Sequence, residues 1–160
     1  MPADHQHIVN ITLDEKSVVR RNPDIEHEQK VAIYDLLDLN HFALVEHPDC
    51  GPFSVHLTIE DNRLVFDIRA EDDITRLTRL PLPVISFRKI IKDYFHICDS
   101  YFTAIKTASP SKIEAIDMGR RGLHNEGTEL LLERLKGKIN TDFDTARRLF
   151  TLICVLHIRG

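Results

Sequence analysis

The hydrophobic pattern changes its period once along the chain, and this change limits the folds that the sequence can adopt. Residues 53–69 alternate apolar and polar side chains on either side of Asp61 and Asn62, which is typical of an antiparallel hairpin with one buried face. From Ser86 onward, apolar residues recur with the period of an α-helix. This order of patterns predicts an α+β fold in which helices cover one face of a sheet.

Shorter signals complete the predicted sheet. Residues 8–13 and 42–45 are predicted strands, and residues 74–80 are a predicted edge strand that Pro81 and Pro83 end. We therefore expect a small antiparallel sheet of three to five strands, covered on one face by the carboxyl-terminal helices.

One helix is predicted before the sheet. Asn22 and Pro23 fit a cap followed by a first-position proline, with Glu26 placed to complete a capping box, and the apolar pattern continues to about Leu39. The side chains expected to face inward are Ile25, Ala32, Leu36 and Leu39.

Three helices are predicted after the sheet. The first presents a broad apolar face made of Phe87, Ile90, Ile91, Tyr94, Phe95, Cys98, Tyr101, Phe102 and Ile105. Thr141 is the predicted cap of the last helix. From Leu149 onward that helix is apolar almost all round, so it is either the central helix of the domain or half of an interface between two copies.

The middle helix, residues 109–135, is the most unusual. Ser109 and Pro110 suit its start. Its apolar stripe includes Gly119 and Gly127, which we expect to let another backbone approach. The alternative interpretation is two helices that break near Gly122.

Composition indicates a single globular domain over residues 1–160, with residues 1–7 as a loose terminus. We expect no signal peptide and no membrane span. Cys50, Cys98 and Cys154 form no C-x-x-C motif, which favours free thiols and a cytoplasmic location.

The net charge of −4 gives no general attraction to nucleic acid. Residues 1–80 carry 8 Lys and Arg against 16 Asp and Glu, whereas residues 81–160 carry 13 against 9. The simpler explanation is that the two halves face and neutralise each other. The alternative is that the basic half meets an anionic partner.

Candidate catalytic residues share one face of the 109–135 helix. Asp117, Arg121 and His124 follow at helical spacing, and Thr128 continues the line. Arg120 lies closer to the apolar face and would need a carboxylate or carbonyl partner if buried. The simpler interpretation is a set of surface salt bridges, which contribute little to stability.

The sequence contains no phosphate-binding loop, no dinucleotide fingerprint, no nucleophile elbow and no H-E-x-x-H motif. We therefore assign no cofactor and no metal site. Two Arg-Arg pairs, Arg120-Arg121 and Arg147-Arg148, are the candidate anion-binding residues, because guanidinium groups suit phosphate.

Several segments, among them DMGRRGLHNEG and DFDTARRLFTLICVLH, resemble an uncharacterised protein family known mainly from alphaproteobacteria. The resemblance covers nearly the whole chain. It implies a small bacterial cytosolic protein and brings no activity, cofactor or catalytic residue.

Three functional hypotheses follow. The first is a non-enzymatic binding or interaction protein, a homodimer formed through surplus apolar helix surface. The second is a metal-assisted or acid–base hydrolase, with His124 as base or ligand, Asp117 as its orienter or a second ligand, and Arg120 and Arg121 as an anion clamp. The third is recognition of an anionic ligand or RNA through the four arginines. Nucleic acid is the less favoured of these two partners, because no aromatic residue lies near the arginines for base stacking.

Overall fold

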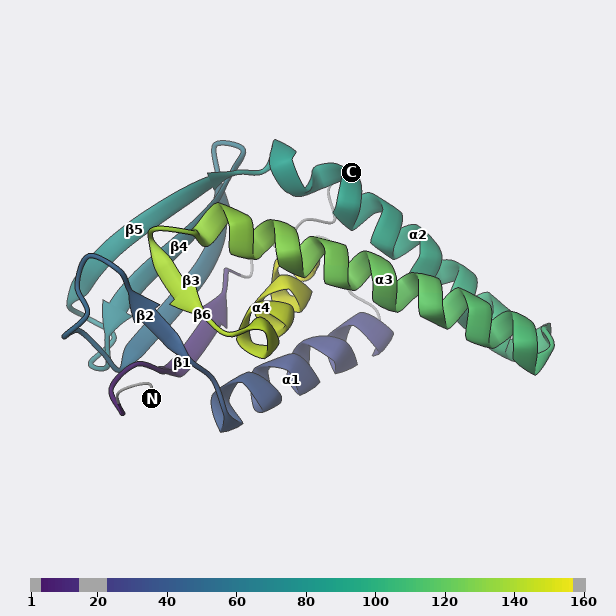
Figure 1. The fold of residues 1–160 in the computed structure, drawn as a ribbon, viewed down its shortest axis with the longest axis horizontal. Helices are drawn as coiled ribbons and strands as arrows, with labels where there is room; N and C mark the ends of the chain where they lie inside the picture. Colours follow the sequence, from purple (N-terminus) through teal and green to yellow (C-terminus); the bar gives the residue numbers. More distant parts are fainter. Residues whose placement is uncertain (1–3, 15–22, 157–160) are drawn as a thin grey trace.

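The computed structural model describes residues 4–14 and 23–156 and has the predicted α+β fold (Figure 1). The elements in chain order are β1 (Ile8–Leu13), α1 (Pro23–Asp38), β2 (Phe42–Leu44), β3 (Phe53–Glu60), β4 (Arg63–Ala70), β5 (Arg76–Pro83), α2 (Ile85–Thr107), α3 (Pro110–Leu135), β6 (Ile139–Thr141) and α4 (Phe143–Leu156). The sheet lies at one end of the molecule and the helices extend away from it.

The main sheet has the strand order β1-β3-β4-β5 and is mixed. The predicted hairpin is confirmed as β3 and β4, and both turn residues, Asp61 and Asn62, have the positive φ angles that a tight hairpin turn requires. The prediction of a purely antiparallel sheet is wrong, because β1 runs parallel to β3. A helical crossover through α1 lies between these strands and brings the chain back in its original direction.

The edge strand was predicted with the wrong end. β5 lies at the edge of the sheet as expected, but it continues through Pro81 and Pro83. These prolines are paired with Val65 and Arg63 of β4. Residues two apart in a strand have the same orientation, so the backbone nitrogens of both prolines face the open edge of the sheet. A nitrogen at that edge has no strand to bond to, so the lack of an N–H group in proline loses no hydrogen bond there.

A second, two-stranded sheet joins β2 to β6, and β6 was missed by the sequence analysis. Thr141, the predicted helix cap, belongs to this strand. The cap of α4 is Asp142 instead, whose Oδ1 accepts a hydrogen bond from Thr145 N at 3.0 Å. Asp142 is a strong N-cap residue in its own right, so the prediction was one residue too early.

α3 is one continuous helix, which settles the choice between one helix and two. Ser109 caps it by accepting a hydrogen bond from Lys112 N at 3.3 Å, as predicted. α2 and α3 form an antiparallel pair that extends beyond the rest of the molecule (Figure 1). The expectation that another backbone comes close to Gly127 is wrong, because the ring of Phe150 fills the space beside this glycine.

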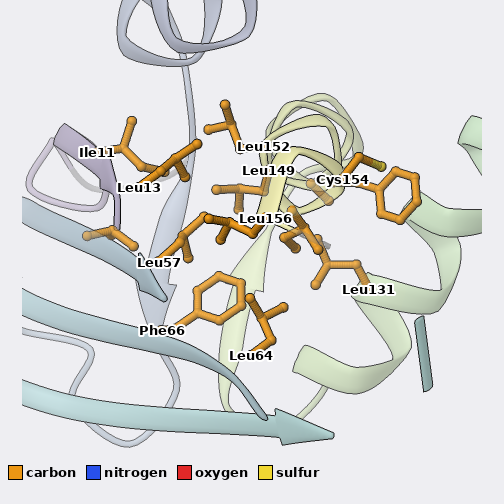
Figure 2. Packing of buried hydrophobic residues seen from close by; sticks show 14 of the residues in the cluster. Ile11, Leu13, Leu57, Leu64, Phe66, Leu131, Leu149, Leu152, Cys154 and Leu156 are labelled. Carbon is orange, nitrogen blue, oxygen red and sulfur yellow. The ribbon is translucent and has the colours of Figure 1, made fainter. Parts of the chain in front are cut away.

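α4 is the central helix of the fold. It packs against α1, α3 and β3, and its Leu149, Leu152 and Leu156 belong to one hydrophobic cluster with Leu57 and Phe66 from the sheet (Figure 2). All these side chains are buried. Of the two interpretations of the apolar carboxyl-terminal helix, the structure therefore supports the central one.

Two predicted core residues are exposed. Ile25, Ala32 and Leu36 of α1 are buried as expected, but Leu39 is 76 % exposed because the helix ends at Asp38. Ile105 is 48 % exposed because it lies toward the far end of α2, where few other elements reach (Figure 1). The predicted cap Asn22 lies outside the described residues.

Residues 4–7, which we expected to form a loose terminus, make contacts with the body of the protein. His5 Nε2 lies 2.8 Å from Pro48 O, and Phe42 N donates to Gln6 O at 3.0 Å. Among the described helices, none has the length and apolar composition needed to cross a membrane.

Candidate functional site

The four arginines singled out from the sequence line one cleft. The cleft has a volume of about 720 Å³ and lies where α1, α3 and α4 meet, with Tyr94 of α2 in its wall. α3 contributes Arg120, Arg121, His124 and Asn125. α4 contributes Phe143, Asp144, Arg147, Arg148 and Thr151. α1 forms the opposite wall with His27, Glu28, Val31, Ala32 and Asp35.

Arg120 is held within the protein. Its Nε and Nη2 donate to Asp117 Oδ1 at 3.1 and 2.7 Å. Its Nη1 lies 3.9 Å from Glu28 Oε1, and its Cζ lies 4.7 Å from the centre of the Tyr101 ring. The partner that a half-buried arginine needs is therefore supplied by Asp117. The Glu28 contact also links the acidic and basic halves of the chain.

Asp117 is shared between two arginines. Arg121 Nε lies 3.3 Å from Asp117 Oδ2, and the Arg121 side chain is 64 % exposed. Hydrogen bonds from Arg120 lower the pKa of Asp117, and the charge of Arg121 adds to this. Within the described residues, no hydrogen bond or ion pair joins Asp117 to His124, so the structure does not bring these two candidates together as base and orienter.

Arg147 and Arg148 are less tightly held. Arg147 Nε lies 4.0 Å from Asp144 Oδ1, a long contact between exposed groups. Arg148 Nε is buried and has no hydrogen-bond partner in the part of the chain that the structure describes. Among the described residues, the terminal nitrogens of these two guanidinium groups therefore form no ion pair.

His124 lies in the wall of the cleft and is largely buried, although it shares a helix face with Asp117 and Arg121. Its ring meets Tyr94 and Phe150 edge to face, with 5.2 Å between ring centres in each pair. Its Nε2 lies 2.8 Å from Thr151 Oγ1, and the Thr151 hydroxyl donates to Arg147 O at 3.2 Å. The hydroxyl therefore accepts a hydrogen bond from His124 Nε2, which assigns the hydrogen to that nitrogen.

The environment keeps His124 neutral. Burial lowers the pKa of His124 to about 4, and the positive charges of Arg147 and Arg120 act in the same direction. A general base works best with a pKa near the working pH, so this ring is a poor base at neutral pH. In the described part of the chain, no three His, Cys, Asp or Glu side chains are grouped so that they could hold a metal ion.

The acidic wall of the cleft was not identified from the sequence. Glu28, Val31 and Asp35 follow at steps of three and four on α1, so they share a face. Burial raises the pKa of Glu28, and the charge of Arg120 opposes this only in part. The periodicity of α1 could have shown the shared face, but it could not show which helices lie opposite.

A second polar cluster, which lies on the face of the sheet opposite Val55 and Leu57, was also missed. His56 contacts Thr12 through Nδ1, and its Nε2 lies 2.5 Å from Asp73 Oδ1. Ser54 Oγ donates to the same carboxylate oxygen at 2.7 Å. Asp73 has a φ of 64°, a conformation that few side chains adopt, and these hydrogen bonds hold it there. The cluster anchors the β4–β5 loop to β1 and β3.

Fold and cleft together define a small α+β protein with an arginine-lined pocket between three helices. The chain belongs to an uncharacterised protein family (UPF0262), whose family model matches residues 5–159. It is 61 % identical over 155 residues to a UPF0262 protein of Paramagnetospirillum magneticum, covering 97 % of this chain and 98 % of the relative. A UPF0262 protein of Bradyrhizobium sp. is 60 % identical over 153 residues, with 96 % and 90 % covered. No solved structure matches this one.

Proposed function

We propose that the protein is a non-enzymatic binding protein that holds a small anionic ligand in the arginine cleft. The observation that carries this proposal is that the half-buried side chain of Arg148 lines the cleft and forms no ion pair or hydrogen bond among the described residues. A half-buried guanidinium group without a partner costs free energy, and an anion bound to it would remove that cost.

The neighbouring arginines support the same proposal. Arg121 and Arg147 open into the same cleft, and each contacts its carboxylate through Nε, so the terminal nitrogens have donors to spare. The volume of about 720 Å³ lies within the range of roughly 300–1,000 Å³ that is usual for small-molecule pockets.

The two alternative functions draw less support. Carboxylates of α1 and α4 share the cleft with the arginines, and they would repel the long polyanionic backbone of RNA. The acid–base hydrolase requires Asp117 beside His124, whereas Asp117 is bound to Arg120 and Arg121.

Calorimetric titration with pyrophosphate and with citrate tests the proposal. Both anions should bind, more weakly as salt rises, because exposed charges are screened. Arg147→Gln and Arg148→Gln should each weaken binding about tenfold, the effect of one charge-assisted hydrogen bond. Arg134→Gln is the matched control, since Arg134 is exposed on α3 and does not line the cleft. No binding to either anion, or equal loss in the control, would contradict the proposal.

We also propose a cytoplasmic location and a homodimer. The three cysteines are free, which suits a reducing compartment. The apolar surface of α4 that first suggested a dimer is buried inside the chain, so support for pairing comes instead from Tyr34 and Leu39, which are 74 % and 76 % exposed at and just beyond α1. Light scattering after size exclusion should give twice the chain mass of 18.5 kDa, and cell fractionation should place the protein with cytoplasmic markers.

A further inference from the structure

The two walls of the cleft carry opposite charges. α1 places Glu28 and Asp35 on one side, and α4 places Arg147 and Arg148 on the other. Opposite charges that share a pocket normally pair directly when they can reach each other, because the pair needs no further partner.

These charges are largely unpaired across the cleft. The ion pair that crosses it, between Glu28 and Arg120, is long at 3.9 Å, and the short hydrogen bonds of Arg120 go to Asp117. Among the described residues, neither the carboxylate of Asp35 nor the guanidinium of Arg148 forms an ion pair. Both side chains are half-buried. A half-buried acid and a half-buried base therefore line one space without touching each other.

The cleft also presents an apolar surface. Val31 lies between Glu28 and Asp35 on the same face of α1 and is 43 % exposed, and Phe143 at the start of α4 is 42 % exposed. Exposed apolar side chains inside a polar cleft offer contact to an apolar part of a ligand.

We propose that the ligand is a zwitterion with an apolar portion. Its positively charged nitrogen binds Asp35 and Glu28, its carboxylate or phosphate binds Arg147 and Arg148, and its apolar portion contacts Val31 and Phe143. This inference rests on the anionic-ligand function proposed above and adds the cationic group. A ligand of this kind would neutralise both walls at once, which neither a simple anion nor a simple cation can do.

Two matched sets of probes test the inference by calorimetry, and within each set the members differ in one charged group. The phosphate set is O-phosphoethanolamine, its N-acetyl derivative and ethanolamine, and it tests the two charged groups without an apolar portion. The carboxylate set is L-phenylalanine, N-acetyl-L-phenylalanine and phenethylamine. In at least one set, the zwitterion should bind about tenfold more tightly than its N-acetyl derivative, and the amine alone should bind weakly. The set that shows this preference tells whether the anionic group is a phosphate or a carboxylate.

Variants assign the two ends of the ligand. Asp35→Asn should weaken the zwitterion about tenfold and leave the N-acetyl derivative unchanged. Arg148→Gln should weaken both. Asp38→Asn is the control for Asp35, because Asp38 is exposed on the same helix and does not line the cleft.

The inference is overturned if the N-acetyl derivatives bind as tightly as the zwitterions, or if Asp35→Asn affects both probes equally. It is also overturned, while the anionic-ligand function stands, if pyrophosphate or citrate binds through Arg147 and Arg148 but no zwitterion does. Failure of every probe, pyrophosphate and citrate included, overturns the proposed function itself.

Discussion

The ring of Phe150 occupies the space that a side chain at Gly127 would need. A Cβ built on Gly127 of α3 would lie far inside van der Waals contact with three atoms of this ring. Phe150 belongs to the central helix and is fully buried, so the ring has little room to move. The glycine therefore sets how closely α3 and α4 approach.

Substitution of this glycine should destabilise the protein. Although alanine favours helix by about 1 kcal/mol over glycine, overpacking of a tight core costs roughly 1–3 kcal/mol or more. We expect Gly127→Ala to lower the free energy of unfolding, measured by urea denaturation. Gly122→Ala is the control on the same helix, because no atom lies within 4 Å of its Cβ position. That variant should gain up to about 1 kcal/mol, and a loss at Gly122 equal to the loss at Gly127 would contradict the packing argument.

Local patterns predicted much of the fold. The alternation over residues 53–69 and the helix start at Ser109 and Pro110 depend on interactions within a few residues. They can therefore be predicted without knowing the rest of the chain. The direction of β1 and the existence of β6 depend on partners far along the chain. β6 was missed because its three residues are too few to show a period and its last residue, Thr141, was interpreted as a helix cap.

The arrangement of the candidate residues was predicted only in part. The two Arg-Arg pairs were predicted as one set of anion-binding candidates, and all four arginines do line one cleft. His124 was placed on the same helix face as Asp117 and Arg121, whereas its side chain is buried beside Phe150. The reason is that His124 and Gly127 lie on the face of α3 that meets Thr151 and Phe150 of α4. No pattern within α3 alone reveals which face meets α4.

Asn40 replaces a strand partner for the start of β1. Its Oδ1 accepts from Ile8 N at 2.7 Å, and its Nδ2 donates to Ile8 O at 3.0 Å and to Leu36 O at 2.7 Å. Asn40→Asp removes the donor and sets a carboxylate oxygen against two carbonyls. We expect a loss of roughly 2–3 kcal/mol, because Ile8 is fully buried. Urea denaturation should show the loss, and Asn140→Asp on the exposed side of β6 should not.

Protonation of Asp67 should make the protein less stable in acid. Burial alone would raise the pKa of this carboxyl, but hydrogen bonds from Arg69 and Arg76 outweigh that effect and lower it. A carboxyl with a lowered pKa in the folded state stabilises the fold above its usual value of 3.8, and this contribution is lost as the pH falls through the folded-state pKa. Asp67→Asn should therefore cost stability at pH 7 and make little difference near pH 2. A constant difference between variant and parent across this range would show that the ion pairs do not carry the effect.

His124 should cause a second loss of stability at a higher pH. Its folded-state pKa of about 4 lies below the ordinary 6.5, so the unfolded chain takes up this proton first as the pH falls. The contribution of neutral His124 to the free energy of unfolding is fully present above pH 6.5. It is lost as the pH falls to about 4, in total by about 3 kcal/mol. Denaturation by urea at pH 7.5 and pH 5 measures most of this change.

The variant His124→Gln separates this titration from all others. Glutamine does not titrate, so the variant should lose less stability than the parent between pH 7.5 and pH 5, by about 2 kcal/mol. It should also be less stable at pH 7.5, because the ring no longer packs between Tyr94 and Phe150. NMR titration of the His124 ring gives the folded-state pKa directly. Equal pH-dependent losses in both proteins, or a ring that titrates near 6.5, would mean that His124 is open to solvent and that the wall of the cleft is not as described.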